Sequence, residues 1–454
     1  MAYFNLMILL SRYIFAGFGI LYIIVSFSFM KPFTNYKLGK ASEKNKFLYI
    51  CLVFFHLGGI SIVAGKQTDL AIRMSIVRNG LIVFALITIT LWLLRIWHRH
   101  NEIILWNLMF FLIDIGYIML ERLDHKLASK QIIAYVIGIA VALIFPSIFS
   151  VLIRPANKYL YLFVLVVTMI IPFFFGSKVL GATNWVEIAG MSLQPSEIGK
   201  VALVLFLSAL FYDFDHKHYK NKIILFSIIV IIITLGCLVL QRDLGAALLY
   251  YLTFLIMLFM ATQSFVLPTL GMVAGSVGGV MGYFMFSHVR ERVEAWLDPW
   301  KDISDTGYQV VQGLFAIGTW GWFGSGLTRG VPNKIPFAET DYIFAALCEE
   351  FGTLIGVIIL FCYLGIILQC INVALRQENE FYRLIVIGIA ALFTVQIFII
   401  VGGVLKLIPL TGITSPFLSA GGSSMVVCIG MIGLITHFSH KSNKEGVKEG
   451  AQRG

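Results

Sequence analysis

The chain has 454 residues, of which 59% are hydrophobic and 13% are charged, with 34 Lys and Arg against 24 Asp and Glu. A soluble domain is typically about 45–50% apolar and about 25% charged, so we expect the apolar excess to face lipid. This composition excludes a cytosolic enzyme, a secreted module and a disordered chain. We interpret the net charge of +10 as basic loops that set membrane topology, and we expect no nucleic-acid partner.

A membrane span needs about 20 apolar residues, and thirteen stretches qualify. In chain order they are 4–28, 47–65, 79–97, 103–120, 131–153, 158–176, 196–213, 222–240, 244–262, 265–287, 342–371, 384–408 and 416–438. Barrel strands would alternate over about 10 residues, whereas these stretches are apolar all round. The sequence therefore predicts an all-α, multipass integral membrane protein.

Basic residues predict which loops are cytoplasmic, because Lys and Arg accumulate on that side of the membrane. They cluster in residues 31–46, 95–99, 154–158, 217–222 and 441–448, which all fall on one side if there are thirteen spans. The polar tail 441–454 is then cytoplasmic and the N-terminus is outside. Residues 66–78 and 121–130 fit poorly, because they are basic on the predicted outer face. A long loop, residues 288–341, also lies outside, and its tryptophans indicate that it rests at the membrane interface.

Ionisable side chains in the apolar stretches need a reason, since each costs about 2.5–3.5 kcal/mol at mid-bilayer. Glu197 and Lys200 share a helix face and form either a structural ion pair or the polar lining of a substrate groove. Asp341 opens a helix after the long loop, where it either complements the helix dipole or acts as a general base. We interpret Glu349 and Glu350 as structural residues that pair with another helix. The same requirement for a reason applies to Asp114 and Asp243.

Three cationic residues are candidates for binding an anionic group. Arg290 and Arg292 begin the long loop, and they form either a solvated charged face or a site for an anionic headgroup, since Arg suits phosphate. Lys406 lies beside Pro409 in an apolar stretch, where it either serves similarly or extends its ammonium to the membrane surface.

Four segments resemble the SEDS family (shape, elongation, division and sporulation), which includes FtsW, RodA and SpoVE. They are GATNWVEIAGMSLQPSEIGK at 181–200, QRDLGA at 241–246, the stretch 290–350 with DPW, GYQ and ETDYIFAALCEE, and LIPLTGITSPFLSAGGSS at 407–424. They occur in family order and spacing over about residues 103–440. The resemblance implies a ten-helix SEDS-type domain at 101–440. It leaves an N-terminal extension of about three membrane helices, residues 1–100, without an indicated function.

The resemblance implies a peptidoglycan glycosyltransferase that polymerises lipid II, the undecaprenyl-pyrophosphate-linked disaccharide-peptide. It would act on the extracellular face of the cytoplasmic membrane, in division, elongation or sporulation. The family's catalytic Asp corresponds to Asp341. The polar residues of its Q-P-S-E-x-x-K segment correspond to Gln194, Glu197 and Lys200, which we expect to bind substrate.

The expected chemistry is inverting and needs no nucleotide, because the pyrophosphate leaving group is already activated. Its negative charge would be stabilised by Lys200, Arg290 and Arg292, with Lys406 and Mg²⁺ or Mn²⁺ as further candidates. Asp341 itself is an alternative ligand for such a metal. The expected partners are the growing glycan strand, a class B penicillin-binding transpeptidase and the lipid bilayer.

Three residues depart from the family pattern. Asn184 stands where the family has Arg, Ala420 where it has Tyr, and Glu339 at a His-like position. The missing Arg weakens the expectation that this loop binds pyrophosphate in the family's usual way. Two other classes of function stay open: a transporter of a polyprenyl-linked glycan, since transporters also carry charges at helix ends in the membrane, and a non-catalytic scaffold that recruits a transpeptidase.

Overall fold

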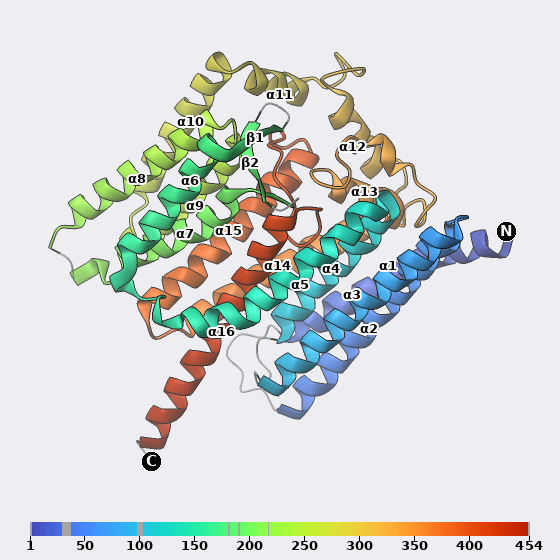
Figure 1. Cartoon of the computed structure of the whole chain (residues 1–454), viewed down its shortest axis with the longest axis horizontal. Helices are drawn as coiled ribbons and strands as arrows, with labels where there is room; N and C mark the ends of the chain where they lie inside the picture. The colour runs from blue at the N-terminus through green and yellow to red at the C-terminus, as the bar shows by residue number, and fades with distance from the viewer. Residues whose placement is uncertain are drawn as a thin grey trace.

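The structure is a computed structural model that describes residues 2–29, 38–97, 103–179, 182–188, 191–216 and 218–452 (Figure 1). Several residues of the predicted basic loops, at 31–37, 98–99 and 217, lie outside the described residues. Twelve described helices are long and apolar enough to cross a membrane, which confirms a multipass membrane protein. The remaining predicted span, 196–213, corresponds to a helix of 17 residues, Pro195–Phe211.

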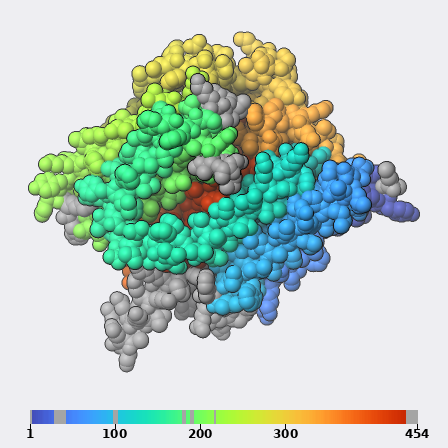
Figure 2. Space-filling model, in the orientation of Figure 1, coloured from blue at the N-terminus to red at the C-terminus, as the bar shows by residue number. Residues whose placement is uncertain are grey.

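The helices before the long loop are α1 (Ala2–Phe29), α2 (Leu38–Lys66), α3 (Leu70–Trp97), α4 (Ile103–Leu123), α5 (His125–Ile148), α6 (Lys158–Phe175), α7 (Pro195–Phe211), α8 (Lys220–Leu240), α9 (Leu244–Thr262) and α10 (Val266–Met285). The loop contains α11 (Ser287–Leu297) and α12 (Tyr308–Gly318), and is followed by α13 (Ile343–Phe351), α14 (Thr353–Leu375), α15 (Glu380–Val404) and α16 (Gly422–Gln452). The yellow-to-orange part of the chain, which includes the long loop, covers one end of the helical bundle (Figure 2).

The core of the bundle is built around α4. In the most apolar stretch of α4, 100% of the residues are buried inside the protein, whereas in that of α10 none are. α4 packs against α2, α3, α5 and α14, so the N-terminal helices lie directly beside it (Figure 1). A helix that is apolar all round is expected either in the centre of such a bundle or facing lipid, and only the packing distinguishes α4 from α10.

A small antiparallel sheet in the order β1-β2-β3 separates α6 from α7, although the sequence predicted an all-α chain. Its strands are β1 (Gly176–Val179), β2 (Ala182–Ile188) and β3 (Met191–Leu193), too short to produce a readable alternation pattern. Gly176 makes the entry possible, since a Cβ there would lie 2.2 Å from the Pro172 carbonyl oxygen. The sheet contacts α7 through β2, the strand that carries Asn184 and Trp185.

The predicted span 342–371 is broken at Gly352, which has a φ of +94°. The backbone groups left without helical partners on either side of the break form hydrogen bonds with the long loop. The amides of Ser325 and Gly326 donate to the last turn of α13 at 2.9 and 3.0 Å, and the amide of Thr353, at the start of α14, donates to the Gly321 carbonyl at 3.2 Å. This long-range pairing explains why hydropathy alone predicted one continuous helix.

The two adjacent glutamates of α13 have different partners. Glu350 pairs with Arg122 of α4 at 3.1 Å, which confirms the predicted pairing with another helix. Glu349 instead accepts a hydrogen bond from the Val331 amide at 2.6 Å, so its partner is the long loop. Glu350 also accepts a hydrogen bond from the Thr328 amide of the long loop at 3.0 Å, so both carboxylates hold the loop against the bundle.

Candidate functional site

The start of α7 supplies a buried ion pair. Pro195 occupies the first turn, where its missing N–H is not needed, and Glu197 and Lys200 follow on one face. The Lys200 ammonium lies 2.5 Å from a Glu197 carboxylate oxygen, with 1% and 9% of the two side chains exposed. Lys200 also approaches the Gln396 amide oxygen of α15 at 3.4 Å. The two predicted alternatives for this pair are therefore compatible: it is an ion pair, and it lines the cavity described below.

Asp243 joins the sheet, α7 and α9. One carboxylate oxygen caps α9 by accepting from the Ala246 amide at 3.0 Å. The other accepts from the side-chain amides of Asn184 and Gln194, both at 2.8 Å. Sequence reasoning marked Asp243 as needing a partner but did not find these two. Gln194, predicted to bind substrate, thus has its amide nitrogen bonded to Asp243.

Asn184 is the residue that replaces the family's Arg. Its amide nitrogen donates to Asp243, while its amide oxygen is buried without a hydrogen-bond partner among the described residues. The side chain lines the same cavity as Glu197 and Lys200. A neutral amide bonded to a carboxylate therefore occupies this position, without the positive charge of an arginine.

Asp341 lies where the long loop meets α13. The preceding backbone is held by the 407–424 segment, because the Ser419 hydroxyl donates to the Thr340 carbonyl at 2.6 Å and the Ala420 amide donates to the Glu339 carbonyl at 2.9 Å. Burial raises the pKa of Asp341 to about 6, although the positive charge of Arg292 acts in the opposite direction. A carboxylate with this pKa is ionised at neutral pH and can accept a proton from a substrate.

Arg292 and Lys406 bring positive charge to the cavity that Asp341 lines. Arg292 donates to the Thr411 carbonyl at 2.7 Å. A Cβ on Gly412 would lie 3.5 Å from the Arg292 guanidinium and 3.6 Å from the Asp341 carboxylate, so this glycine lies beside both groups. Lys406 reaches the Leu297 carbonyl at 3.4 Å.

These groups surround one cavity of about 580 Å³. It brings together six of the seven predicted residues: Gln194, Glu197, Lys200, Arg292, Lys406 and Asp341. Arg290 does not line it and instead lies over the Tyr283 ring at 5.7 Å. The wall also includes residues that sequence reasoning did not select as site residues: Trp185, Asp243, Tyr250, Trp296, Asp305 and Gln309. The cavity combines a proton acceptor with cations that suit an anionic substrate.

The described residues contain no cluster of three or more His, Cys, Asp or Glu side chains that could hold a metal ion. The residues present therefore do not fit a resident Mg²⁺ or Mn²⁺ site with three such ligands. The expectation of Mg²⁺ or Mn²⁺ in the reaction stays a prediction.

Residues 103–444 match the family model of the cell cycle proteins FtsW, RodA and SpoVE. The peptidoglycan glycosyltransferase RodA of Mycobacterium tuberculosis is 34% identical over 358 residues, which cover 73% of this chain and 76% of that protein. RodA of Mycobacterium leprae is 30% identical over 410 residues, covering 85% and 88% of the two chains. A probable peptidoglycan glycosyltransferase FtsW of Geobacter sulfurreducens is 36% identical over 280 residues, which cover 58% of this chain and 72% of that protein.

Solved structures show the same fold. A chain of a peptidoglycan synthase complex that coordinates polymerization and crosslinking aligns with a TM-score of 0.62 and 23% identity, covering 74% of this chain and 97% of that chain. The rod shape determining protein RodA of Thermus thermophilus aligns with a TM-score of 0.54 and 21% identity, covering 74% and 95%. The family match over residues 103–444, together with the RodA relatives that are 34% and 30% identical, shows that the chain belongs to the FtsW, RodA and SpoVE family of cell cycle proteins.

Proposed function

We propose that this peptidoglycan glycosyltransferase polymerises lipid II, with Asp341 as its general base. The observation that carries the proposal is the position of Asp341: a carboxylate with a pKa raised to about 6 by burial, in one cavity with Arg292, Lys200 and Lys406. A base and several cations are the groups that a transfer reaction with a pyrophosphate leaving group requires.

In the proposed reaction, Asp341 accepts the proton of the 4-hydroxyl of the acceptor GlcNAc. The hydroxyl oxygen attacks C1 of the donor MurNAc, and undecaprenyl pyrophosphate leaves with inversion of the anomeric centre. A positioned general base contributes about 10²–10⁴-fold to such a rate. Since the pyrophosphate is already activated, no nucleotide takes part.

The charge that develops on the pyrophosphate needs fixed positive groups. Arg292 belongs to the part of the cavity wall that the long loop forms, and its guanidinium is held by the Leu410 and Thr411 carbonyls at 3.2 and 2.7 Å. Lys200 and Lys406 line the same space. We assign these three cations to the donor pyrophosphate, with Arg292 also keeping the Asp341 carboxylate ionised.

The proposal places the cavity on the extracellular face of the cytoplasmic membrane. Its support is the bias of basic residues toward the opposite loops, which is the usual sign of the cytoplasmic side. A class B penicillin-binding transpeptidase is the proposed partner, and the growing glycan strand is the acceptor. The likeness to a chain of a complex that coordinates polymerization and crosslinking supports such a partner.

The test is lipid II polymerisation by the purified full chain in detergent, wild type against Asp341→Asn. The variant is nearly isosteric and cannot act as a base, so we expect the rate to fall at least about 100-fold with unchanged thermal unfolding. Full activity in Asp341→Asn would reject Asp341 as the base. Detergent leaves no membrane across which substrate could be moved. Polymerised lipid II made by the purified wild type would therefore not be explained by a transporter or by a non-catalytic scaffold.

A further inference from the structure

We propose that α1–α3 is an intramolecular positioning unit for the long loop, and that Arg12 and Tyr13 on α1 are positioning residues for Asp341. The family match begins at residue 103, the first residue of α4, and leaves these three helices outside it. The inference rests on the proposed function of Asp341. It assigns a role to a part of the chain for which the sequence indicated none.

The extension is fixed to α4 by a buried polar pair. One ring nitrogen of His56, on α2, lies 2.5 Å from the Asp114 carboxylate of α4, with 1% and 0% of the two side chains exposed. The other ring nitrogen lies 2.9 Å from the Gly80 carbonyl of α3. A buried carboxylate that loses its partner is strongly unfavourable, so α2 and α3 are held against α4.

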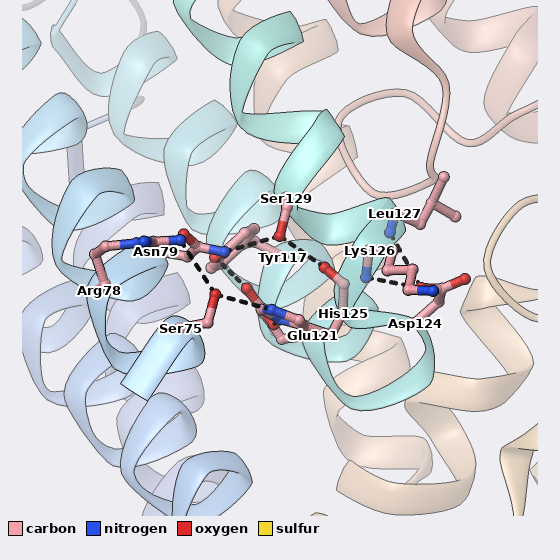
Figure 3. A network of polar contacts seen from close by, with 10 residues as sticks. All are labelled: Ser75, Arg78, Asn79, Tyr117, Glu121, Asp124, His125, Lys126, Leu127 and Ser129. Atoms are coloured by element: carbon pink, nitrogen blue, oxygen red, sulfur yellow. Dashed lines mark hydrogen bonds and ion pairs between the residues drawn. The ribbon is translucent and has the colours of Figure 1, made fainter. Parts of the chain in front are cut away.

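A second polar network joins α3 to the turn between α4 and α5 (Figure 3). His125 lies 2.6 Å from the Glu121 carboxylate and 3.0 Å from the Ser75 hydroxyl of α3. The Asn79 amide of α3 donates to the Ser129 hydroxyl of α5 at 2.9 Å. The two networks fix the extension at two levels along α4, so it behaves as part of the bundle.

α4 in turn contacts two segments that hold the Asp341 region. The Arg122 guanidinium donates to Glu350 at 3.1 Å and to the Gly330 carbonyl of the long loop at 3.3 Å. Gly116 packs against the backbone of the 407–424 segment, where a Cβ would lie 2.5 Å from the Leu418 carbonyl oxygen. That segment is the one whose Ser419 hydroxyl holds the Thr340 carbonyl.

α1 also contacts the long loop directly. The Arg12 guanidinium donates to the Gly324 carbonyl at 3.3 Å and to the Tyr13 hydroxyl at 2.8 Å. The Tyr13 ring lies against the Phe323 ring, with centroids 4.8 Å apart. These contacts reach residues 321–326, the same segment that completes the broken ends of α13 and α14.

The path from α1 to Asp341 therefore runs through residues 321–326 and the nine-residue helix α13. Residues 321–326 are bonded to the last turn of α13, and α13 begins at Ile343, directly after Asp341 and Tyr342. The other groups that act on the Asp341 carboxyl are Arg292, the Thr340 hydroxyl and Glu339. Asp341 is partly exposed to the cavity, and loosening residues 321–326 would let α13 shift and expose its carboxyl further to water, so its pKa would fall toward that of an exposed carboxyl.

The experiment measures lipid II polymerisation against pH for the purified full chain carrying Arg12→Ala, Arg12→Lys or Tyr13→Phe. The matched control is Arg73→Ala, which removes an exposed arginine of α3. For Arg12→Ala we expect kcat to fall about tenfold, which equals about 1.4 kcal/mol, with little change in KM and with the acidic midpoint of kcat/KM moved below its wild-type value. Arg12→Lys, which keeps a hydrogen-bond donor, should restore part of kcat and part of the acidic midpoint. Arg73→Ala should behave as wild type.

A shifted acidic midpoint separates positioning from a loss of folded protein, because fewer active molecules lower the rate without moving the midpoint. An unshifted midpoint in Arg12→Ala, or a normal kcat in both Arg12 variants, would overturn the inference. A wild-type protein that does not polymerise lipid II would overturn the proposed function, and the inference with it. The activity of the wild-type protein therefore distinguishes failure of the proposed function from failure of the inference about α1–α3.

Discussion

Replacing Lys200 by Met should lower the stability of the folded protein, because it removes one partner of the buried ion pair of α7. The ammonium lies 2.5 Å from Glu197 and is 1% exposed, and Met keeps most of the side-chain volume. The substitution leaves the Glu197 carboxylate buried without its cation, which costs about 3–5 kcal/mol. The contact with Gln396 at 3.4 Å is lost as well, so we expect the destabilisation of Lys200→Met to lie in the upper part of that range.

The comparison that tests this reasoning is a double-mutant cycle. Glu197→Gln together with Lys200→Met removes both charges, so the double variant should be more stable than Lys200→Met alone by about 2 kcal/mol or more, since a buried pair replaced as a unit costs little. Thermal unfolding of the four purified proteins measures the difference. A Lys200→Met protein within about 1 kcal/mol of wild type, or a double variant that is no more stable than the single, would refute the reasoning.

The same pair can be reversed to separate structure from substrate binding. Glu197→Lys with Lys200→Glu keeps an ion pair on one helix face but moves the cation within the cavity. If the pair is only structural, lipid II polymerisation should partly return relative to the single variants. If Lys200 binds the donor pyrophosphate, folding should return while the rate stays low.

Two further predictions concern proton transfer and packing. The carboxylate of Asp341 is active only when deprotonated and its pKa is about 6, so kcat/KM should rise with pH through about 6. In Arg292→Gln, which removes the charge that lowers this pKa, the rise in kcat/KM should move to higher pH. A wild-type profile that is flat between pH 5 and 8 would contradict the assignment. Gly116→Ala would place a Cβ 2.5 Å from the Leu418 carbonyl oxygen and should destabilise the protein by about 1–3 kcal/mol, as measured by thermal unfolding. Gly17→Ala, on a helix position with no atom within 4 Å, is its control, and equal melting temperatures for the two variants would show that α4 does not pack on this segment as described.

The sequence by itself determined the class of the protein and the positions of most spans, because hydropathy is a local property that adds up along the chain. Family motifs further indicated Asp341, Glu197 and Lys200, which the structure brings to one cavity. The same local reasoning missed the sheet at 176–193 and the break at Gly352. Both depend on backbone hydrogen bonds between segments, which hydropathy does not contain.

Only the tertiary structure decided which polar residues meet. Arg290 and Arg292 are two positions apart in sequence, yet Arg292 lines the cavity and Arg290 does not. Asp114 needed a partner by the energy of burial alone, but that partner, His56, lies 58 positions earlier on another helix. A buried charge predicts from sequence that a partner exists, whereas the identity of the partner follows from how the helices pack. The role we propose for α1–α3 could therefore be inferred only after α4 was seen at the centre of the bundle.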